Sequence, residues 1–370
     1  ADASPDRTRI YLDRTAFYPT SGGQPFDLGT LGGVRINEVV DEDGRVAHVL
    51  SAPLEGDEVA GSIDWTRRFD HMQQHTGQHL LSAVLLKALG APTVSFHLGA
   101  DYATIDIARA ALEPAELRAV EEHANRVVFE NRPVAVSFAD ASDDLALRKP
   151  TEREGTIRII TIADLDRSAC GGTHVRATGE IGPILLRKLD KVRGNVRIEF
   201  LCGMRAVRRA RADYEALAGI ARQFSSTLDE VPPLVAAQGE KLQESDKARR
   251  KLAGELAQAA GRELHAKTAP DQNGLRRVVR KTAAITDELR AEAQSFAACG
   301  GAAFLAVAQN PPSVLVTASP DSGLDAGKWL KKALPPLGGR GGGNPTMAQG
   351  SLQSSVAVDV IVREFETLPE

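Results

Sequence analysis

The chain has 370 residues, 42% of them hydrophobic and 25% charged, which is the ordinary composition of a globular protein of two or three domains. A chain of this length can bury a core without disulfide or metal staples, so we expect any bound metal to serve function rather than folding. The net charge of −4 excludes a generic binder of polyanions, three cysteines exclude a disulfide framework, and no apolar run reaches the length of a membrane span, so we expect a cytoplasmic protein.

Residues 1–64 are expected to form a small β-barrel or sandwich. Three strand-like runs, residues 34–40, 45–50 and 58–64, are separated by turns rich in glycine and aspartate. The segment 17–25, with the sequence FYPTSGGQP, is predicted to be a loop because prolines and glycines interrupt it.

Residues 65–203 are predicted to form an α+β domain. A long helix over residues 67–89 should end at Gly90, and a second helix over residues 114–130 should begin at Pro114, which suits the first helical position. After this second helix we expect strands at residues 134–138, 156–162, 184–189 and 196–201. The run 156–162 is dense in β-branched residues, as a half-buried strand should be.

The remainder is predicted to comprise a helical arm, residues 204–267, and a small glycine-rich α/β domain, residues 268–370. The arm carries an a/d stripe of apolar residues that Pro232 and Pro233 interrupt. The stripe consists of Tyr214, Leu217, Ala221, Phe224 and Leu228. In the last domain we expect strands at 302–308, 314–318 and 355–362, helices near 286–298 and 325–334, and a glycine-rich loop at 338–343.

One stretch of the chain is strongly basic. Residues 187–211 contain nine lysines or arginines and two acids, Asp190 and Glu199. Such a run is either a solvated surface or a docking patch for phosphates, and composition alone leaves both readings open.

Two pairs of residues in the predicted α+β domain have the spacing of metal ligands. His75 and His79 lie four apart on the long helix and so on one face, although an isolated pair of this kind is weak evidence. Cys170 and His174 repeat the spacing, and three imidazoles with one thiolate suit zinc. The helix lacks the glutamate of the zincin motif, since Thr76 occupies that place.

The segment between the second pair of ligands is expected to meet the substrate. Gly171 and Gly172 leave the backbone bare, so a substrate can approach closely. Four protein ligands close a tetrahedral site, whereas catalytic zinc keeps a position open. We therefore expect one ligand to be weak, and His174 is the candidate.

Four motifs in this order resemble the editing domain of alanyl-tRNA synthetase and the free-standing alanyl-tRNA editing proteins. The fourth also resembles the C-terminal domain that this synthetase shares with DHH-type phosphoesterases. The motifs are FYPTSGGQPFD at 17–27, HMQQHTGQHLLS at 71–82, CGGTH at 170–174 and GGRGGGNPTMAQG at 338–350.

The resemblance implies a zinc-dependent hydrolase that cleaves the ester of tRNA(Ala) carrying serine or glycine. It implies that Thr76 contacts the serine hydroxyl, and Gln78 and His97 are further candidates for the pocket. Zinc could activate a water or orient the substrate's amine, and the sequence leaves both roles open. Backbone amides at Gly341 and Gly342 are expected to face tRNA phosphates, and a homodimer is expected through the helical arm or the C-terminal domain.

Several alternatives remain open from the sequence. No class II aminoacylation motif is visible, and the HTGQH wording favours the free-standing form, acting in trans, over an excised editing half of the synthetase. The chain could instead edit another tRNA, as the related threonyl-tRNA synthetase domains do, or bind tRNA without catalysis around a structural zinc. A phosphoesterase is disfavoured because the Asp-His-His metal motif is missing.

Overall fold

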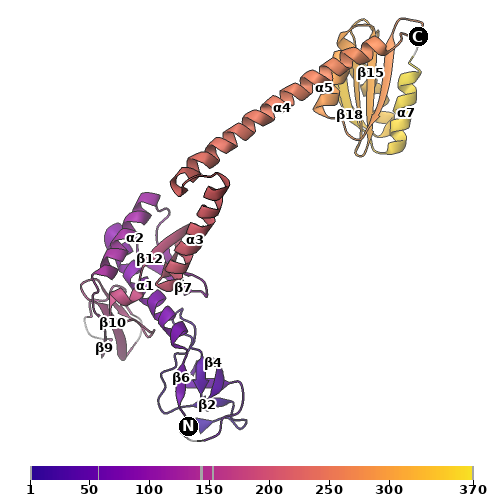
Figure 1. Cartoon of the computed structure of the whole chain (residues 1–370). Helices are drawn as coiled ribbons and strands as arrows, with labels where there is room; N and C mark the ends of the chain where they lie inside the picture. The colour runs from indigo at the N-terminus through magenta and orange to yellow at the C-terminus, as the bar shows by residue number, and fades with distance from the viewer. Residues whose placement is uncertain (1, 57, 142–144, 152–153, 369–370) are drawn as a thin grey trace. The chain divides into compact units, whose positions relative to one another are not determined.

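The computed structural model describes residues 2–56, 58–141, 145–151 and 154–368. The chain divides into two compact units, residues 1–223 and 224–370, and each is described by itself (Figure 1). No helix in the described ranges combines the length and the hydropathy that a membrane span requires. The finer division into four parts stays a prediction.

The first unit begins with an antiparallel sheet of six strands in the order β1-β2-β5-β4-β3-β6. Asp43 and Gly44 both have positive φ, 51° and 85°, and make the tight hairpin between the two longest strands. Strands predicted at 34–40 and 45–50 are confirmed, and closure of the sheet into a barrel stays a prediction. The strands are β1 Asp2–Ala3, β2 Arg9–Tyr11, β3 Gly29–Leu31, β4 Val34–Glu42, β5 Arg45–Leu50 and β6 Gly61–Ile63.

Helix α1, Trp65–Leu89, is the central element of the first unit. It begins where the side chain of Asp64 accepts a hydrogen bond from the backbone of Arg67, and it ends at Gly90, which has a left-handed conformation. Residues 73–85 of this helix are all buried, including the polar positions His75 and His79. A helix that is enclosed on every side can present polar side chains to a buried site, because its neighbours supply their partners.

A four-stranded antiparallel sheet in the order β12-β13-β8-β7 packs against this helix. The approach is close at Gly77, where a Cβ atom would collide with the sulfur of Cys202. Helix α2, Pro114–Phe129, completes the layer, and its start at Pro114 is confirmed. The strands are β7 Thr93–Leu98, β8 Ala103–Ile107, β12 Ile184–Val192 and β13 Asn195–Cys202.

A three-stranded sheet in the order β11-β10-β9 supplies the second half of the candidate site. Strands β9, Val134–Asp140, and β10, Thr156–Ile162, were predicted, whereas the short β11, Asp166–Ala169, was not. Cys170 follows β11 directly, and η1, Thr178–Ile181, lies beyond the CGGTH turn. Helix α3, Met204–Gln223, closes the first unit.

The helical prediction needs one correction in the arm. Helix α3 ends at Gln223, so the apolar stripe extended too far, and Phe224 and Leu228 lie outside that helix. After η2, Leu228–Glu230, helix α4 runs over Val231–Lys267, with Pro232 and Pro233 in its first turn. Those prolines are compatible with the start of the second helix, because the first turn needs no amide donors.

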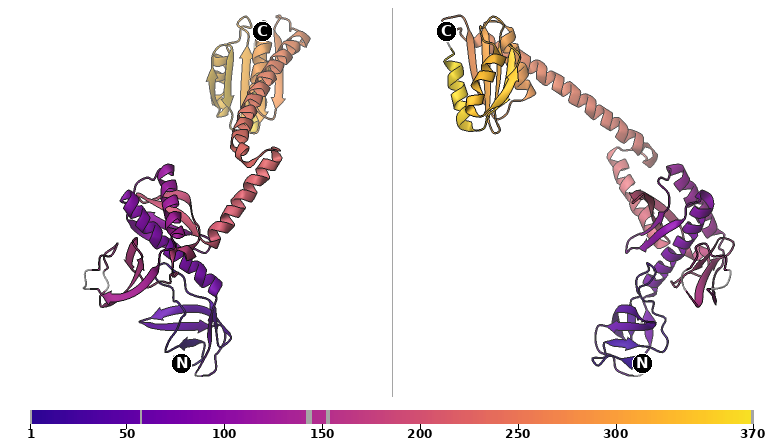
Figure 2. Two further views of the ribbon diagram at one scale, coloured as in Figure 1. Left: turned by 60° about the vertical axis from the view of Figure 1, so that its left-hand side comes forward. Right: turned by 180° about the vertical axis from the view of Figure 1, so that it is seen from behind.

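The second unit is built on a five-stranded sheet in the order β14-β15-β16-β18-β17, with helices on both faces (Figure 2). Helix α5, Asp287–Ala298, covers one face, and α6, Ala326–Ala333, with α7, Ser355–Glu366, covers the other. The strands are β14 Arg276–Thr282, β15 Ala302–Gln309, β16 Pro312–Ala318, β17 Arg340–Gly343 and β18 Met347–Ser351, with the short η3 at Pro335–Leu337.

Two predictions for this unit were wrong. Residues 355–362 form the start of α7 rather than a strand, because Ser354 caps the helix and Val358, Ile361 and Phe365 recur at helical spacing in the core. The glycine-rich segment is largely the edge strand β17 rather than a loop. A Cβ at Gly341 would meet the Leu334 side chain and the backbone of β18, so glycine is needed there for close packing.

Candidate metal centre

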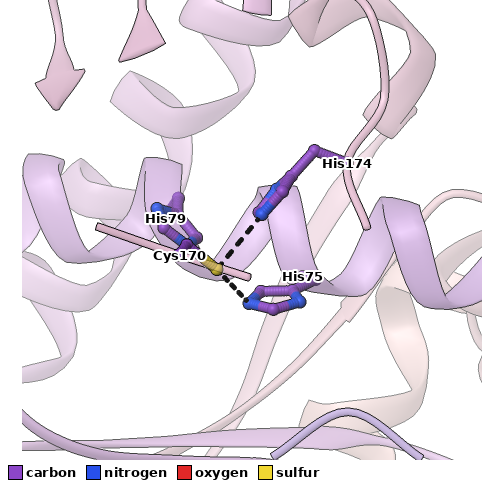
Figure 3. A group of neighbouring side chains, drawn as sticks. All are labelled: His75, His79, Cys170 and His174. Carbon is purple, nitrogen blue, oxygen red and sulfur yellow. Dashed lines mark hydrogen bonds between the residues drawn. The ribbon is translucent and has the colours of Figure 1, made fainter. Parts of the chain in front are cut away.

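Four side chains from two distant segments converge in the first unit (Figure 3). The ligand atoms of His75, His79, Cys170 and His174 all lie within 4.8 Å of one another. Helix α1 supplies the first two on one face, and the turn after β11 supplies the other two. The three imidazoles are buried and the thiol is half-buried, so any occupant would be largely shielded from solvent.

The spacing of these atoms fits a tetrahedral zinc ion. The sulfur of Cys170 lies 3.5 Å from Nε2 of His75 and 3.4 Å from Nε2 of His174. Zinc bonds of about 2.3 Å to sulfur and about 2.0–2.1 Å to nitrogen, at tetrahedral angles, separate the two atoms by about 3.5 Å. These two pairs therefore have the separation that a zinc ion bound between them would require.

Each imidazole has a second partner at its other nitrogen. Nδ1 of His75 lies 2.9 Å from Oε1 of Gln24, and Nδ1 of His79 lies 3.0 Å from Oδ2 of Asp166. Nδ1 of His174 lies 3.2 Å from the hydroxyl of Thr76. A metal-bound histidine usually donates its remaining N–H to such an acceptor, which fixes the ring and leaves Nε2 free to bind.

Asp166 is held as a carboxylate. Its Oδ1 accepts a hydrogen bond of 2.6 Å from Nε of Arg148, and the hydroxyl of Ser168 donates to both its oxygens. Burial alone raises the pKa of Asp166, but the hydrogen bond with His79 and the charge of Arg148 outweigh it and hold that pKa below its usual range. An ionised Asp166 only accepts hydrogen bonds, so Nδ1 of His79 carries the proton.

Two of the candidate ligands are in the protonation states that a metal needs. Burial opposes ionisation of Cys170, but hydrogen bonds with the surrounding imidazoles lower the pKa of its thiol to about 2. Burial lowers the pKa of His174 to about 3, so its ring is neutral at pH 7. Thiolate and neutral imidazole are the forms that bind zinc.

A cleft of about 480 Å³ opens onto the centre, a volume that suits a small ligand or the end of a large one. It reaches His75, His79 and Cys170, whereas His174 is absent from its lining. Its walls are formed by Tyr18, Ser21 and Gly22, residues 93–96 of β7, the segment 148–151 and the turn 168–172. A larger groove of about 690 Å³ between α2, β12 and α3 is lined by none of the four candidate ligands.

The residues predicted for the pocket occupy different positions. Gln78 lines the cleft, while Thr76 is fully buried, donates to the carbonyl of Met72 and accepts from the amide of Val175. His97 has an exposed side chain in β7 and is not among the residues lining this described cleft, although its neighbour Phe96 is. The pocket roles of Gln78, Thr76 and His97 stay predictions.

The two glycines of the CGGTH turn differ sharply. Gly171 is exposed at the cleft and a Cβ there would meet nothing within 4 Å. A Cβ at Gly172 would collide with the imidazole of His75 and press on Gln24. Gly172 thus makes room for a candidate ligand, whereas Gly171 leaves room at the surface that a substrate would reach. Gly341 and Gly342 belong to β17 in the second unit.

Sequence reasoning missed the residues that orient the candidate ligands. Gln24 lies inside the FYPTSGGQPFD motif, and Asp166 lies four positions before Cys170, but no spacing rule connects either residue with a histidine. Their partners are 51 and 87 residues away, so only packing brings them together.

Many charges of the basic stretch 187–211 are neutralised by acidic side chains of the same chain. Five of its nine cations form ion pairs: Arg187 with Glu199, Lys188 with Asp190, Arg197 with Asp106, Arg205 with Asp70 and Arg209 with Asp213. Four cations have no ion pair among the described residues: Lys191, Arg193, Arg208 and Arg211. A phosphate patch would therefore rest on fewer charges than composition suggested.

Comparison with known proteins gives a consistent grouping. Residues 157–199 match the family model described as the threonyl and alanyl tRNA synthetase second additional domain, and residues 235–368 match the DHHA1 domain. The alanyl-tRNA editing protein AlaX-L of Pyrococcus horikoshii is 31% identical over 94% of this chain and 89% of that protein.

Two further relatives differ in how much of their length is matched. An alanine–tRNA ligase of Methanoregula boonei is 34% identical over 92% of this chain, but the match spans only 38% of the ligase. The alanyl-tRNA editing protein Aarsd1 of Danio rerio is 36% identical over 55% of this chain and 52% of that protein. The similarity to the ligase therefore concerns only a part of it.

Proposed function

This chain belongs to the family of alanyl-tRNA editing proteins, and we propose that it hydrolyses tRNA(Ala) mischarged with serine, and also with glycine, in trans at a zinc ion held by His75, His79, Cys170 and His174. It is accordingly an aminoacyl-tRNA hydrolase, a class of carboxylic ester hydrolase. The observation that carries the zinc assignment is the orientation of the imidazoles. Each has an acceptor at Nδ1, and two Nε2 atoms lie at tetrahedral distance from a thiolate.

The reaction consumes one water. The water adds to the carbonyl carbon of the ester, the bond to the terminal ribose oxygen breaks, and free amino acid and tRNA leave. Bound zinc supplies Lewis-acid assistance to such a hydrolysis. The cleft reaches three of the four candidate ligands but not His174, so a substrate would approach the centre from the side of His75, His79 and Cys170.

Discrimination against alanine must come from the serine hydroxyl, because alanine is smaller and enters any pocket that admits serine. A site that hydrogen-bonds a substrate hydroxyl can reject the analogue without it by about 10⁴–10⁵ in well-made cases. Thr76 has its hydroxyl occupied by Met72, Val175 and His174. Gln78 lines the cleft, and its Nε2 donates to Ser82, which leaves Oε1 without a hydrogen bond among the described residues. Gln78 is therefore the better candidate for reading the hydroxyl.

A homodimer through α4 is proposed as well. Leu242, Leu252 and Leu256 are exposed on this helix, and exposed leucines on one long helix are suited to pairing with a second copy. The tRNA-facing role of Gly341 and Gly342 is retained as a proposal for the second unit.

A tRNA-binding module with a structural zinc is the second candidate, because four protein ligands can close the metal's coordination. Deacylation of Ser-, Gly- and Ala-tRNA(Ala), with and without a chelator, separates the two. We expect Ser-tRNA to be hydrolysed and Ala-tRNA to be spared, with activity lost on chelation and restored by zinc. Zinc-bound protein that binds tRNA and hydrolyses none of the three would support the structural module.

A further inference from the structure

We propose that Gln24 is a positioning residue that fixes the tautomer of His75 and ties the two halves of the metal centre together. Gln24 comes from the loop 17–27 of the N-terminal sheet, outside the segments that supply the ligands. The inference rests on the proposed zinc function, although its hydrogen bond can be tested without metal. It assigns to the N-terminal residues a direct part in building the site.

The side chain of Gln24 is fully buried and uses both ends of its amide. Oε1 lies 2.9 Å from Nδ1 of His75 and accepts from the backbone amide of Thr173 at 3.1 Å. Nε2 donates to the hydroxyl of Thr173 at 2.8 Å. One side chain therefore contacts a ligand of α1 and the turn that carries Cys170 and His174.

These partners determine where the proton of His75 lies. A backbone N–H only donates, so the Gln24 atom that faces the backbone N–H of Thr173 must be the oxygen. The same oxygen faces His75, and an amide oxygen only accepts, so Nδ1 of His75 must donate. In a neutral ring this leaves Nε2 of His75, the atom that lies 3.5 Å from the sulfur of Cys170, free to bind a metal.

The loop that carries Gln24 is anchored on α1 itself. Asp27 is fully buried and forms an ion pair with Arg68 of that helix, with Nε of Arg68 3.0 Å from Oδ1. The backbone amide of Tyr18 donates to Asp27 at 2.7 Å, which closes the loop. Gly22 and Gly23, with φ of 55° and 85°, make the turn that aims Gln24 at His75.

The same loop also forms a wall of the cleft. Tyr18, Ser21 and Gly22 line it, as do Cys170 and Gly171. A loop that touches both the cleft and a metal ligand couples the shape of the substrate pocket to the geometry of the metal.

The test compares Gln24→Leu and Gln24→Glu with the matched control Gln74→Leu. Gln74 is also fully buried, and its amide hydrogen-bonds to the backbone N–H and C=O of Cys202, but it hydrogen-bonds to none of the four candidate ligands. Zinc affinity is measured by competition with a chromophoric chelator. We expect Gln24→Leu to lower the affinity for zinc about 10- to 100-fold. Gln24→Glu keeps an acceptor oxygen and should retain most of the affinity of the unsubstituted chain.

The control separates positioning from general destabilisation. Gln74→Leu should lower the melting temperature and leave zinc affinity unchanged. Equal losses in Gln74→Leu and Gln24→Leu, or unchanged affinity in Gln24→Leu, would overturn the proposal.

A second readout uses the metal-free protein. ¹⁵N-histidine NMR of the unsubstituted chain should show His75 protonated at Nδ1, and Gln24→Leu should shift it toward the Nε2-protonated form. If the unsubstituted chain takes up no zinc, the proposed function fails, and this NMR comparison still decides the role of Gln24. An identical tautomer in both proteins would contradict it.

Discussion

Oδ2 of Asp166 lies 3.0 Å from Nδ1 of His79, and the other oxygen of the same carboxylate is held by Arg148. The carboxylate therefore orients a candidate ligand, and the guanidinium keeps it ionised. Carboxylate–histidine pairs of this kind raise the basicity of the ligating nitrogen. The centre thus depends on residues that never touch the metal.

Replacing the carboxylate of Asp166 should weaken zinc binding without removing a ligand. We expect Asp166→Asn to raise the dissociation constant for zinc about 10- to 100-fold, because a neutral amide is a poorer acceptor for His79 and leaves Arg148 without a counter-charge. Asp106→Asn is the control, since Asp106 is also buried and paired with an arginine, Arg197, away from the centre. Chelator competition measures the zinc affinity of both variants. Equal zinc affinities in Asp166→Asn and Asp106→Asn would contradict the prediction.

Cys170→Ala removes a ligand outright. The variant should lose both retained zinc and deacylation of Ser-tRNA(Ala), because it lacks the one anionic, soft ligand of the four. Cys299→Ala, at an exposed thiol distant in sequence from the site, should retain both. Metal analysis after dialysis and a deacylation assay provide the readouts. Full activity in metal-free Cys170→Ala protein would end the zinc mechanism.

The two glycines of the CGGTH turn should respond oppositely to one added methyl group. Gly172→Ala forces a Cβ against the ring of His75, and overpacking of this kind costs about 1–3 kcal/mol. Gly171→Ala meets open space and should fold and bind zinc like the unsubstituted chain. Thermal unfolding and zinc content distinguish them, and a Gly172→Ala protein with normal zinc affinity would show that the turn moves freely.

Substrate discrimination should respond to Gln78 and Thr76 in different ways. Gln78→Met removes the unpartnered amide oxygen at the cleft, and a lost hydrogen bond of about 1–1.5 kcal/mol corresponds to roughly tenfold. We expect that loss for Ser-tRNA and little change for Gly-tRNA, which has no hydroxyl to read.

Thr76→Val is the matched comparison for this prediction. It removes the partner of His174, so hydrolysis of both substrates should fall together. Initial rates with each substrate measure the ratio. A selective loss of Ser-tRNA hydrolysis in Thr76→Val would return the recognition role to Thr76.

The sequence pattern was least reliable where valines fit either a strand or a helix and where glycines fit either a loop or a strand. The run from Ser355 contains several valines, which favour a strand. It forms a helix because Ser354 caps it and its apolar residues meet the core at helical spacing. The glycines near residue 340 form an edge strand because α6 and β18 leave no room for a side chain. Tertiary contacts overrode local preference at both places.

The sequence by itself determined the identities of the four candidate ligands. A helix places residues four apart on one face whatever surrounds it, so the spacing alone pairs His75 with His79. The partners of their other nitrogens depended on the tertiary structure, because Gln24 and Asp166 reach the centre only when a distant loop and strand pack beside α1. The same packing gave the hydroxyl of Thr76 to His174, since a buried polar group takes whichever partner its neighbours bring within reach.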